Sequence, residues 1–348
     1  MLSKNIWTEK MSTNENLAEL ARAGYLPTDV NTGDGVVTFS KLAHASFRES
    51  FYSQTVASVD AGMSKQIPFH AIVDQFSDRG DDQHLRLIAH TSRCGSTLLS
   101  NLLSLRSTTM VLKEPDFVTL MARRIALAPH SSEAENFDSL MTALLNFSCH
   151  VAAASGRELV IKLMSWISPS VLASLSNCRN TTWLLVWREP EKVVASNMAK
   201  HPSWGRDTEE GCAARCATGI ADIATGSAEL YAHTWSRIVD SFTSMDSGLR
   251  WRTLEYEDLT SKKAASFVAV EDWFNLTTAA GLPDKFADES SRYSKGSGAE
   301  IFEPTKAHRR APLESSQERK VSVITKRALN TLRSDKRHRL WTGGLGSA

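Results

Sequence analysis

Cysteine, long apolar runs and excess charge of either sign are all scarce in this sequence of 348 residues. The five cysteines are an odd number and do not suggest a disulfide framework, so we expect a reducing, cytoplasmic compartment. No apolar run approaches the roughly 18 residues that cross a bilayer, and the charged first residues lack a signal core. The 40 Lys and Arg residues nearly balance 39 Asp and Glu, which leaves no general basic surface for nucleic acid.

Familiar nucleotide and metal motifs are also missing. The dipeptide Gly-Lys occurs nowhere, so there is no Walker A loop, and the dinucleotide pattern G-x-G-x-x-G is absent. These absences disfavour an ATPase that relies on a loop lysine and Mg²⁺. There is no H-E-x-x-H or C-x-x-C pair, and we interpret Cys212 and Cys216 as one helix face. We therefore expect no metal to be required.

Apolar runs alternate with helical patterns from residue 85 onward, and this alternation is typical of a parallel sheet. The sequence predicts strands at 85–91, 110–114, 159–163, 181–187 and 249–256. It predicts helices at 15–24, 133–154, 190–200, 209–243 and 262–279, and a tight turn followed by an amphipathic helix within 92–105. Helical spacing also occurs at 40–58. The pattern predicts an α/β fold, a parallel sheet flanked by helices. We expect an N-terminal mixed extension over 1–80 that packs on the core, an α/β domain over 81–310 and a basic C-terminal helix or tail over 311–348.

The clearest local motif, HTSRCGSTLL at 90–99, places small residues between a strand and a helix. Gly95 lets the backbone approach a ligand, and the amides of residues 94–98 lie at the positive end of the helix. Ser96 and Thr97 add hydroxyl donors, and Arg93 adds a guanidinium suited to phosphate. The pattern indicates an anion site; the alternative is a helix start that is simply capped by Ser92.

A second motif follows the strand predicted at 181–187. Arg188 ends this strand, Pro190 occupies a favoured first helical position, and Ser196 follows two turns later. Ligands of parallel sheets bind at the carboxyl ends of strands, so we expect Arg188 in the same crevice as Gly95. Arg188 and Ser196 suit a second phosphate; the alternative is a structural pair of Arg188 with Glu189 or Glu191.

Together these segments resemble the sulfotransferase superfamily over roughly residues 85–310. Four motifs carry the resemblance: Ser92-Arg93-Cys94-Gly95-Ser96-Thr97, Arg188-Glu189-Pro190 with Ser196, Tyr256-Glu257-Asp258-Leu259, and LVIKLMSW at 159–166. The loop H-T-S-x-C-x-S-T-L-L looks like that of bacterial sulfotransferase-like proteins. The resemblance implies a P-loop nucleoside triphosphate hydrolase-like fold. It also implies transfer of a sulfuryl group from 3′-phosphoadenosine 5′-phosphosulfate to a hydroxyl or amine of a small-molecule or glycan acceptor.

The resemblance also implies roles for individual residues. Residues Arg93, Cys94, Gly95, Ser96, Thr97 and Leu98 would hold the 5′-phosphosulfate, and Arg188 and Ser196 the 3′-phosphate. A late basic segment closes over that phosphate in the family, and Lys295 is the candidate here, with Arg309 and Arg310 as alternatives. Lys162 matches the family's active-site lysine.

The general base departs from the most familiar family pattern, because Met164 stands where K-x-H places a histidine. Other branches use a glutamate after the second strand, which matches Glu114. We therefore predict Glu114 as the base, with Arg93 and Lys162 stabilising the transferring group and the leaving oxygen. The alternative for Glu114 is a structural ion pair with Lys113 or Lys162. His90, His201 and His308 are alternative bases.

Two other functions stay open from the sequence. A nucleotide-binding module that has lost transfer would account for the missing histidine, and an atypical ATP-dependent kinase would use the same loop with Mg²⁺. The sequence predicts neither the acceptor nor the oligomeric state.

Overall fold

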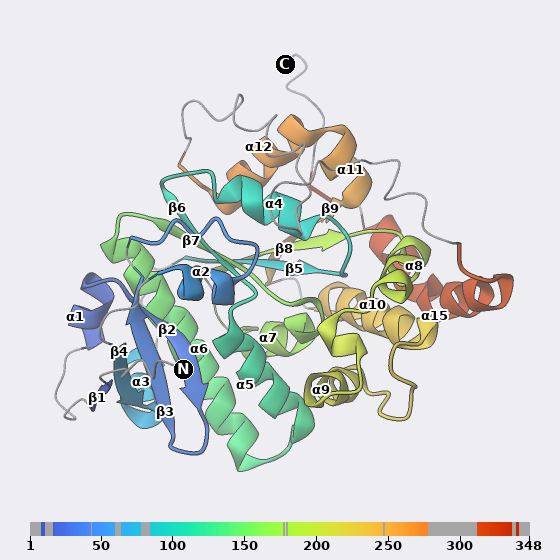
Figure 1. Cartoon of the computed structure of the whole chain (residues 1–348). Coiled ribbons are helices and arrows are strands. Elements are labelled where there is room, and N and C mark those ends of the chain that lie inside the picture. Colours follow the sequence, from blue (N-terminus) through green and yellow to red (C-terminus); the bar gives the residue numbers. More distant parts are fainter. Residues whose placement is uncertain are drawn as a thin grey trace.

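The structure is a computed structural model that describes residues 8–10, 17–42, 44–59, 64–77, 84–176, 178, 180–245, 248–277, 312–335 and 339–340. The elements form a five-stranded sheet covered by helices on both faces and a smaller four-stranded sheet beside it (Figure 1). Among the described residues, no helix is long and apolar enough to cross a membrane.

The large sheet is parallel throughout and has the strand order β6-β7-β5-β8-β9. Its strands are β5 (Leu85–His90), β6 (Thr109–Lys113), β7 (Glu158–Lys162), β8 (Thr181–Trp187) and β9 (Arg250–Glu255). Each lies within one residue of the range that the sequence predicts. The predicted α/β fold, a parallel sheet flanked by helices, is therefore confirmed.

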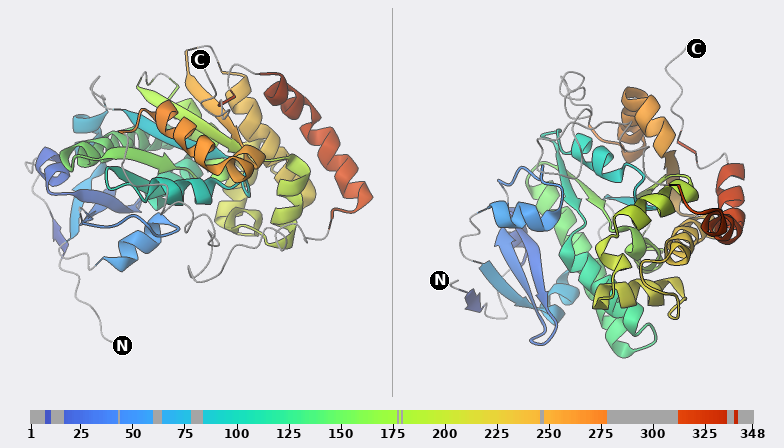
Figure 2. Two further views of the ribbon diagram at one scale, coloured as in Figure 1. Left: turned by 90° about the horizontal axis from the view of Figure 1, so that it is seen from above. Right: turned by 45° about the vertical axis from the view of Figure 1, so that its right-hand side comes forward.

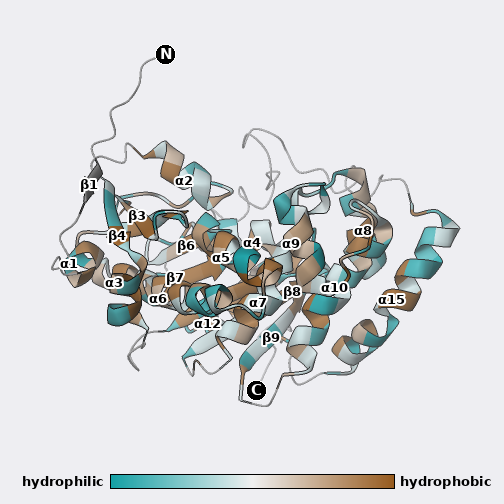
Figure 3. Cartoon of the chain, turned by 90° about the horizontal axis from the view of Figure 1, so that it is seen from below, coloured by the Kyte–Doolittle hydropathy of each residue, from teal (hydrophilic) through white to brown (hydrophobic). Residues whose placement is uncertain are grey.

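Apolar side chains of this sheet alternate between two cores, as the two-residue period of a strand requires. In β8, Trp183 and Leu185 face one core, whereas Leu184 and Val186 face the other. A sheet buried on both faces explains why the run TTWLLVW contains no alternating polar residues. The ribbon of inner strands such as β7 is accordingly coloured brown, for hydrophobic residues, in Figure 3.

Helices cover the two faces unequally. The helices α4 (Ser96–Leu103), α11 (Tyr256–Ser261) and α12 (Lys263–Phe274) pack on one face. The other face is covered by α6 (Ser132–Ala154), α7 (Ser168–Ser174) and α10 (Ala228–Thr243), with α5 (Asp116–Leu127), α8 (Pro190–Ala199) and α9 (Glu209–Thr218) beside them. The 3₁₀ turn η1 (Ser165–Ile167) lies between β7 and α7, and η2 (Ser203–Gly205) lies between α8 and α9.

The single helix predicted over 209–243 is wrong, because the chain forms α9 and α10 with a break between them. Gly219 ends α9 in the left-handed conformation, at φ 73°. The side chain of Ser227 then caps α10 by accepting from the amide of Leu230. A left-handed glycine and a fresh N-cap together end one helix and begin another.

The N-terminal region differs most from its prediction. Helical spacing at 40–58 holds only for α2 (Tyr52–Ser58), and the short helix predicted at 15–24 is α1 (Leu17–Arg22).

The small sheet is formed by four strands of this region. The strands β2 (Tyr25–Asn31) and β3 (Val36–Lys41) form an antiparallel hairpin before α2. The strand β4 (Ser64–Pro68) pairs with β3 on one side and with β1 (Thr8–Lys10) on the other. The helix α3 (Phe69–Phe76) follows β4. Phe39 of β3 packs edge-on against Phe147 of α6, so the small sheet shares a core with the large one.

The last described helix, α15 (Ser315–Ser334), lies outside α10 and α8 at one side of the molecule (Figure 2). Beyond it, Arg339 forms a parallel bridge with Thr253, and the amide of Leu340 donates to the Thr253 carbonyl. The C-terminal segment therefore contacts the outer edge of β9.

A candidate anion site and a buried reactive pair

The turn between β5 and α4 has an unusual backbone. Ser92, Arg93 and Gly95 all have positive φ, at 65°, 48° and 83°. Two left-handed residues that are not glycine cost of order 1–3 kcal/mol each, and such conformations gather at ligand sites. These conformations make a tight turn between β5 and α4. The turn places the first amides of α4 at the carboxyl edge of the sheet.

Gly95 is required here for space as well as for its backbone conformation. A Cβ at this position would lie 3.0 Å from Leu259 and 3.2 Å from the ring of Tyr256. Both residues belong to α11, whose YEDL motif the sequence analysis noted without giving Tyr256 a role. Tyr256 directly follows β9, so its close packing on Gly95 holds the turn beside the carboxyl end of that strand.

Cys94 and Ser92 turn their side chains away from the open side of the turn. The Cys94 sulfur donates to the Val186 carbonyl at 3.1 Å, and burial raises the pKa of its thiol. The Ser92 hydroxyl donates to Asn197 Oδ1 at 3.2 Å. Ser92 therefore does not cap α4: the N-cap is Gly95, with no side-chain cap. Cys94 contributes to the turn only through its backbone.

Arg93 reaches across to α8. Its Nε donates to Asn197 Oδ1 at 3.2 Å, and its Nη2 donates to the Lys200 carbonyl at 2.6 Å. The turn and α8 are thereby joined through Asn197, a buried residue that the sequence analysis missed. Ser196, which the sequence predicts as a phosphate ligand, precedes Asn197 and is also buried.

Arg188 lies directly beside this turn, as the sequence predicts. Its Nη1 donates to the Arg93 carbonyl at 3.5 Å, and its Cζ lies 4.1 Å from the centre of the Tyr256 ring. Its carbonyl accepts from Trp235 Nε1 at 2.9 Å, which fixes the backbone on α10. The alternative pairing with Glu189 or Glu191 is not what the structure shows, since Glu189 pairs with Arg333 instead.

Three buried donors around the turn have no hydrogen-bond partner within the described parts of the chain: Thr97 Oγ1, Arg188 Nε and Asn197 Nδ2. They come from α4, the end of β8 and α8, which meet at residues 92–97. Buried donors are nearly always satisfied in folded proteins, and leaving one unsatisfied costs about 1–3 kcal/mol. A hydroxyl, a guanidinium and an amide NH₂ that all lack an acceptor therefore indicate an anionic ligand. We call residues 92–98, Arg188 and Asn197 the anion half of the site.

Glu114 and Lys162 form a buried ion pair at the ends of neighbouring strands. Lys162 Nζ donates to Glu114 Oε1, and the side chains are 0% and 10% exposed. Glu114 also has a positive φ, 53°, and its amide donates to the Lys162 carbonyl at 2.6 Å. Of the two ion-pair partners that the sequence allowed for Glu114, Lys162 is the one observed.

Lys113, although adjacent to Glu114, has a different task. Its Nζ donates to the carbonyls of Arg48 and Glu49, at 3.2 and 2.8 Å, and to Asn101 Oδ1 at 2.9 Å. Lys113 therefore anchors the segment before α2 to the sheet.

His90 connects the two parts of the site. Its Nδ1 accepts from the Ser92 amide at 3.1 Å, so the neutral ring carries its proton on Nε2. That nitrogen lies 3.8 Å from Glu114 Oε1. His90 thus presents a donor to the carboxylate, which disfavours its use as a base. We call Glu114, Lys162 and His90 the reactive half of the site.

The remaining predicted residues divide between buried and undescribed positions. Trp166, the last residue of the LVIKLMSW motif, is 1% exposed, and its Nε1 donates to Met164 Sδ at 3.1 Å, so it belongs to the core. His201 pairs with the Tyr231 hydroxyl through Nδ1 at 2.7 Å, and burial raises the pKa of Tyr231 to about 12. Lys295, His308, Arg309 and Arg310 lie outside the described residues.

Comparisons with known proteins give a likeness in fold only. No protein-family model and no curated protein matches the chain. The chain is similar to the sulfotransferase domain from the curacin biosynthetic pathway, with 15% identity, 71% of this chain and 99% of that domain covered, and a TM-score of 0.42. It is similar to sulfotransferase STF9 from Mycobacterium avium, with 11% identity, coverage of 92% and 97%, and a TM-score of 0.42. For sulfotransferase STF1 from Mycobacterium tuberculosis H37Rv the values are 12%, 75%, 81% and 0.39. At these identities and TM-scores the likeness assigns no activity to the chain.

Proposed function

We propose that the protein is a sulfotransferase that uses 3′-phosphoadenosine 5′-phosphosulfate as donor and a hydroxyl or amine of a small molecule or glycan as acceptor. The observation that carries this proposal is the set of three unpartnered buried donors around the strained turn. A doubly phosphorylated nucleotide supplies acceptor oxygens for all three. The choice of 3′-phosphoadenosine 5′-phosphosulfate among such nucleotides comes from the four motifs that resemble the sulfotransferase superfamily.

In this proposal the α/β domain of residues 81–310 binds the donor, and the flanking segments 1–80 and 311–348 pack on it. The turn amides and Thr97 hold the 5′-phosphosulfate, while Arg188 and Ser196 hold the 3′-phosphate. Tyr256 keeps the Arg188 guanidinium in place by stacking on it.

The reactive half supports the transfer step. The acceptor oxygen or nitrogen attacks sulfur, its proton passes to the Glu114 carboxylate, and the bond from sulfur to the 5′-phosphate oxygen breaks. Lys162 and Arg93 stabilise the negative charge on that leaving oxygen. The contact with Lys162 holds the Glu114 carboxylate at the ends of β6 and β7, beside the turn.

The deciding experiment is calorimetric titration of adenosine 3′,5′-bisphosphate, without metal, into the wild type and Arg188→Ala. We expect binding by the wild type, preferred over ATP with Mg²⁺, and a loss of at least about 30-fold in the variant, the worth of a charge-assisted contact. The matched control is Arg250→Ala. Arg250 also stacks on an aromatic ring, with its Cζ 5.3 Å from the centre of Trp273, but it begins β9 at the far end of the strand.

The control should bind the nucleotide as the wild type does. If the wild type binds only ATP with Mg²⁺, the kinase alternative replaces this proposal. Binding of the bisphosphate without donor consumption, across a panel of phenols, alcohols, amines and glycans, would favour a module that has lost transfer.

A further inference from the structure

Four carboxylates lie behind the anion half of the site. Glu189 directly follows Arg188, while Glu255, Glu257 and Asp258 flank Tyr256, which stacks on Arg188. The pKa of Glu255 is raised, first by burial and then by the charges of Glu257, Glu189 and Asp258, so these groups lie close enough to interact. Four negative charges beside a site for a phosphorylated nucleotide oppose the binding of that nucleotide.

Two arginines of the C-terminal segment pair with three of these carboxylates. Arg333, in the last turn of α15, donates from Nη2 to Glu189 Oε1 at 2.5 Å. Arg339 donates to Asp258 Oδ2 at 2.9 Å and lies 3.7 Å from Glu255 Oε2. The fourth carboxylate, Glu257, pairs with Lys192 of α8 at 2.8 Å.

The two arginine contacts join parts of the chain that are far apart in sequence. Arg333 holds the start of α8, next to Arg188, and Arg339 holds the start of α11, next to Tyr256. The bridge from Arg339 to Thr253 fixes the same segment along β9. Both arginines thus act on the loops that present Arg188 and its stacking partner.

We propose that Arg333 and Arg339 are positioning residues that neutralise the carboxylates behind Arg188 and so permit a phosphorylated nucleotide to bind there. This inference rests on the proposed function. It gives the C-terminal segment a role in nucleotide affinity although neither arginine is required to touch the nucleotide.

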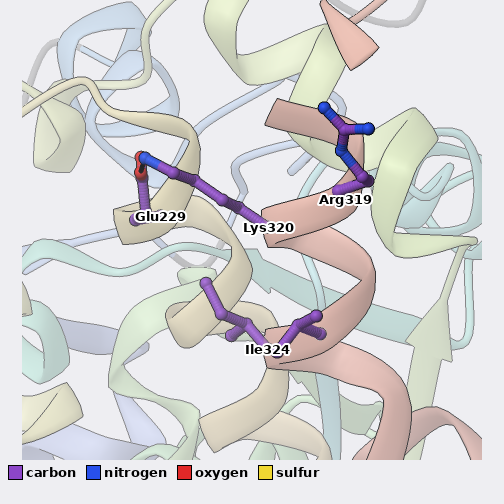
Figure 4. Close-up of a pocket in the computed structure, with 5 residues that line it drawn as sticks. Glu229, Arg319, Lys320 and Ile324 are labelled. Atoms are coloured by element: carbon purple, nitrogen blue, oxygen red, sulfur yellow. Dashed lines mark hydrogen bonds and ion pairs between the residues drawn. The ribbon is translucent and has the colours of Figure 1, made fainter. Parts of the chain in front are cut away.

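A second ion pair on α15 provides a matched control. Lys320 pairs with Glu229 of α10 at 2.6 Å, beside a hollow of about 350 Å³ lined by these two residues with Arg319, Val323 and Ile324 (Figure 4). Thirteen residues separate Lys320 from Arg333, which is about 20 Å along a helix. Lys320→Gln therefore removes a similar pair from the same helix, away from the Glu189 carboxylate.

The test measures the affinity for adenosine 3′,5′-bisphosphate at low and high salt in Arg333→Gln, Arg339→Gln and Lys320→Gln. We expect each arginine variant to bind about three- to tenfold more weakly at low salt, and the difference to shrink as salt screens the charges. Lys320→Gln should bind as the wild type does. Wild-type affinity in both arginine variants would overturn the inference.

The double variant Arg333→Gln/Glu189→Gln distinguishes two roles of Arg333: neutralising the charge of Glu189, or only holding the start of α8 in place. If Arg333 acts by neutralisation, removing the carboxylate as well restores affinity to within about twofold of the wild type. If the double variant binds as weakly as Arg333→Gln alone, the neutralising role is wrong.

Failure of the proposed function is distinguishable from failure of this inference. If the wild type does not bind the bisphosphate, the proposed function fails, and inorganic sulfate then replaces the nucleotide as probe. A rise in melting temperature with sodium sulfate, relative to sodium chloride, that is larger in the wild type than in Arg333→Gln supports neutralisation. Equal rises in both proteins overturn it.

Discussion

The anion half and the reactive half of the site differ in whether their buried polar groups are satisfied. Thr97, Arg188 and Asn197 each keep a buried donor without a partner in the described chain, whereas the buried Lys162 ammonium already has the Glu114 carboxylate. Unsatisfied donors cost stability until a ligand arrives, and a buried ion pair costs stability when one partner is removed. Removing one of the three unsatisfied donors should therefore stabilise the free protein, whereas removing one partner of the buried ion pair should destabilise it.

The largest effect is expected for Glu114→Gln in the reactive half. The substitution removes the base and leaves the Lys162 cation buried without its counter-charge, so kcat should fall about 10²- to 10⁴-fold. The free energy of unfolding should fall by about 3 kcal/mol. Steady-state transfer to the best acceptor and chemical denaturation measure the two effects, and near-normal turnover would contradict the role of Glu114.

A neutral replacement of both partners separates these two effects. In Glu114→Gln/Lys162→Met no charge is left buried, and replacing a buried ion pair by uncharged residues is often neutral for stability. We expect stability to return toward that of the wild type while turnover stays low. Recovery of turnover in this double variant would show that Glu114 matters only for folding.

The next largest effect is expected for Gly95→Ala in the anion half. The added Cβ meets Leu259 at 3.0 Å and Tyr256 at 3.2 Å, in a backbone with φ +83°. Displacing Tyr256 also removes the stacking on Arg188. Calorimetry should show nucleotide affinity about 10- to 100-fold weaker, with stability lower by about 1–3 kcal/mol.

Gly219→Ala is the control for the backbone cost alone. Gly219 has a similar φ of +73°, but an added Cβ there meets nothing within 4 Å. It should lose about 1 kcal/mol of stability and no nucleotide affinity. Equal losses of affinity in both variants would indicate that the contact with Tyr256 is irrelevant.

The parts of the fold that sequence patterns predict are those where local pattern and tertiary environment agree. The run TTWLLVW is buried on both faces of a parallel sheet, so its uninterrupted apolar character identifies β8 correctly. The hairpin of β2 and β3 was missed because the YLPTDVN run of β2 contains Pro27 and Asp29, two residue types that strands disfavour. The pairing of β3 with β4 and the packing of Phe39 on Phe147 identify this part of the chain as a sheet.

The site divides in the same way. Gly95, Glu114, Lys162 and Arg188 follow strands, so the sequence predicts their common edge. Asn197 was missed, and the arginines of the basic C-terminal segment were predicted without their partners, because the partners are 105, 144 and 81 residues away in the chain. No periodicity in the sequence predicts a contact between residues so far apart, so these contacts become visible only in the folded structure.

The smallest effect, expected for Thr97→Val, is also the sharpest test of the comparison. Valine keeps the shape of threonine but removes a buried hydroxyl that has no partner within the described chain. The free protein should gain about 1 kcal/mol in the free energy of unfolding, because an unsatisfied polar group is gone. Nucleotide affinity should fall about three- to tenfold, because the ligand loses a donor.

Thr234→Val is the matched control, since its hydroxyl already donates to the Leu230 carbonyl at 2.8 Å. That variant should lose about 1 kcal/mol of stability and keep its affinity. Destabilisation of the free protein by Thr97→Val would mean that its hydroxyl is satisfied without a ligand, and the anion half would lose one of its three donors.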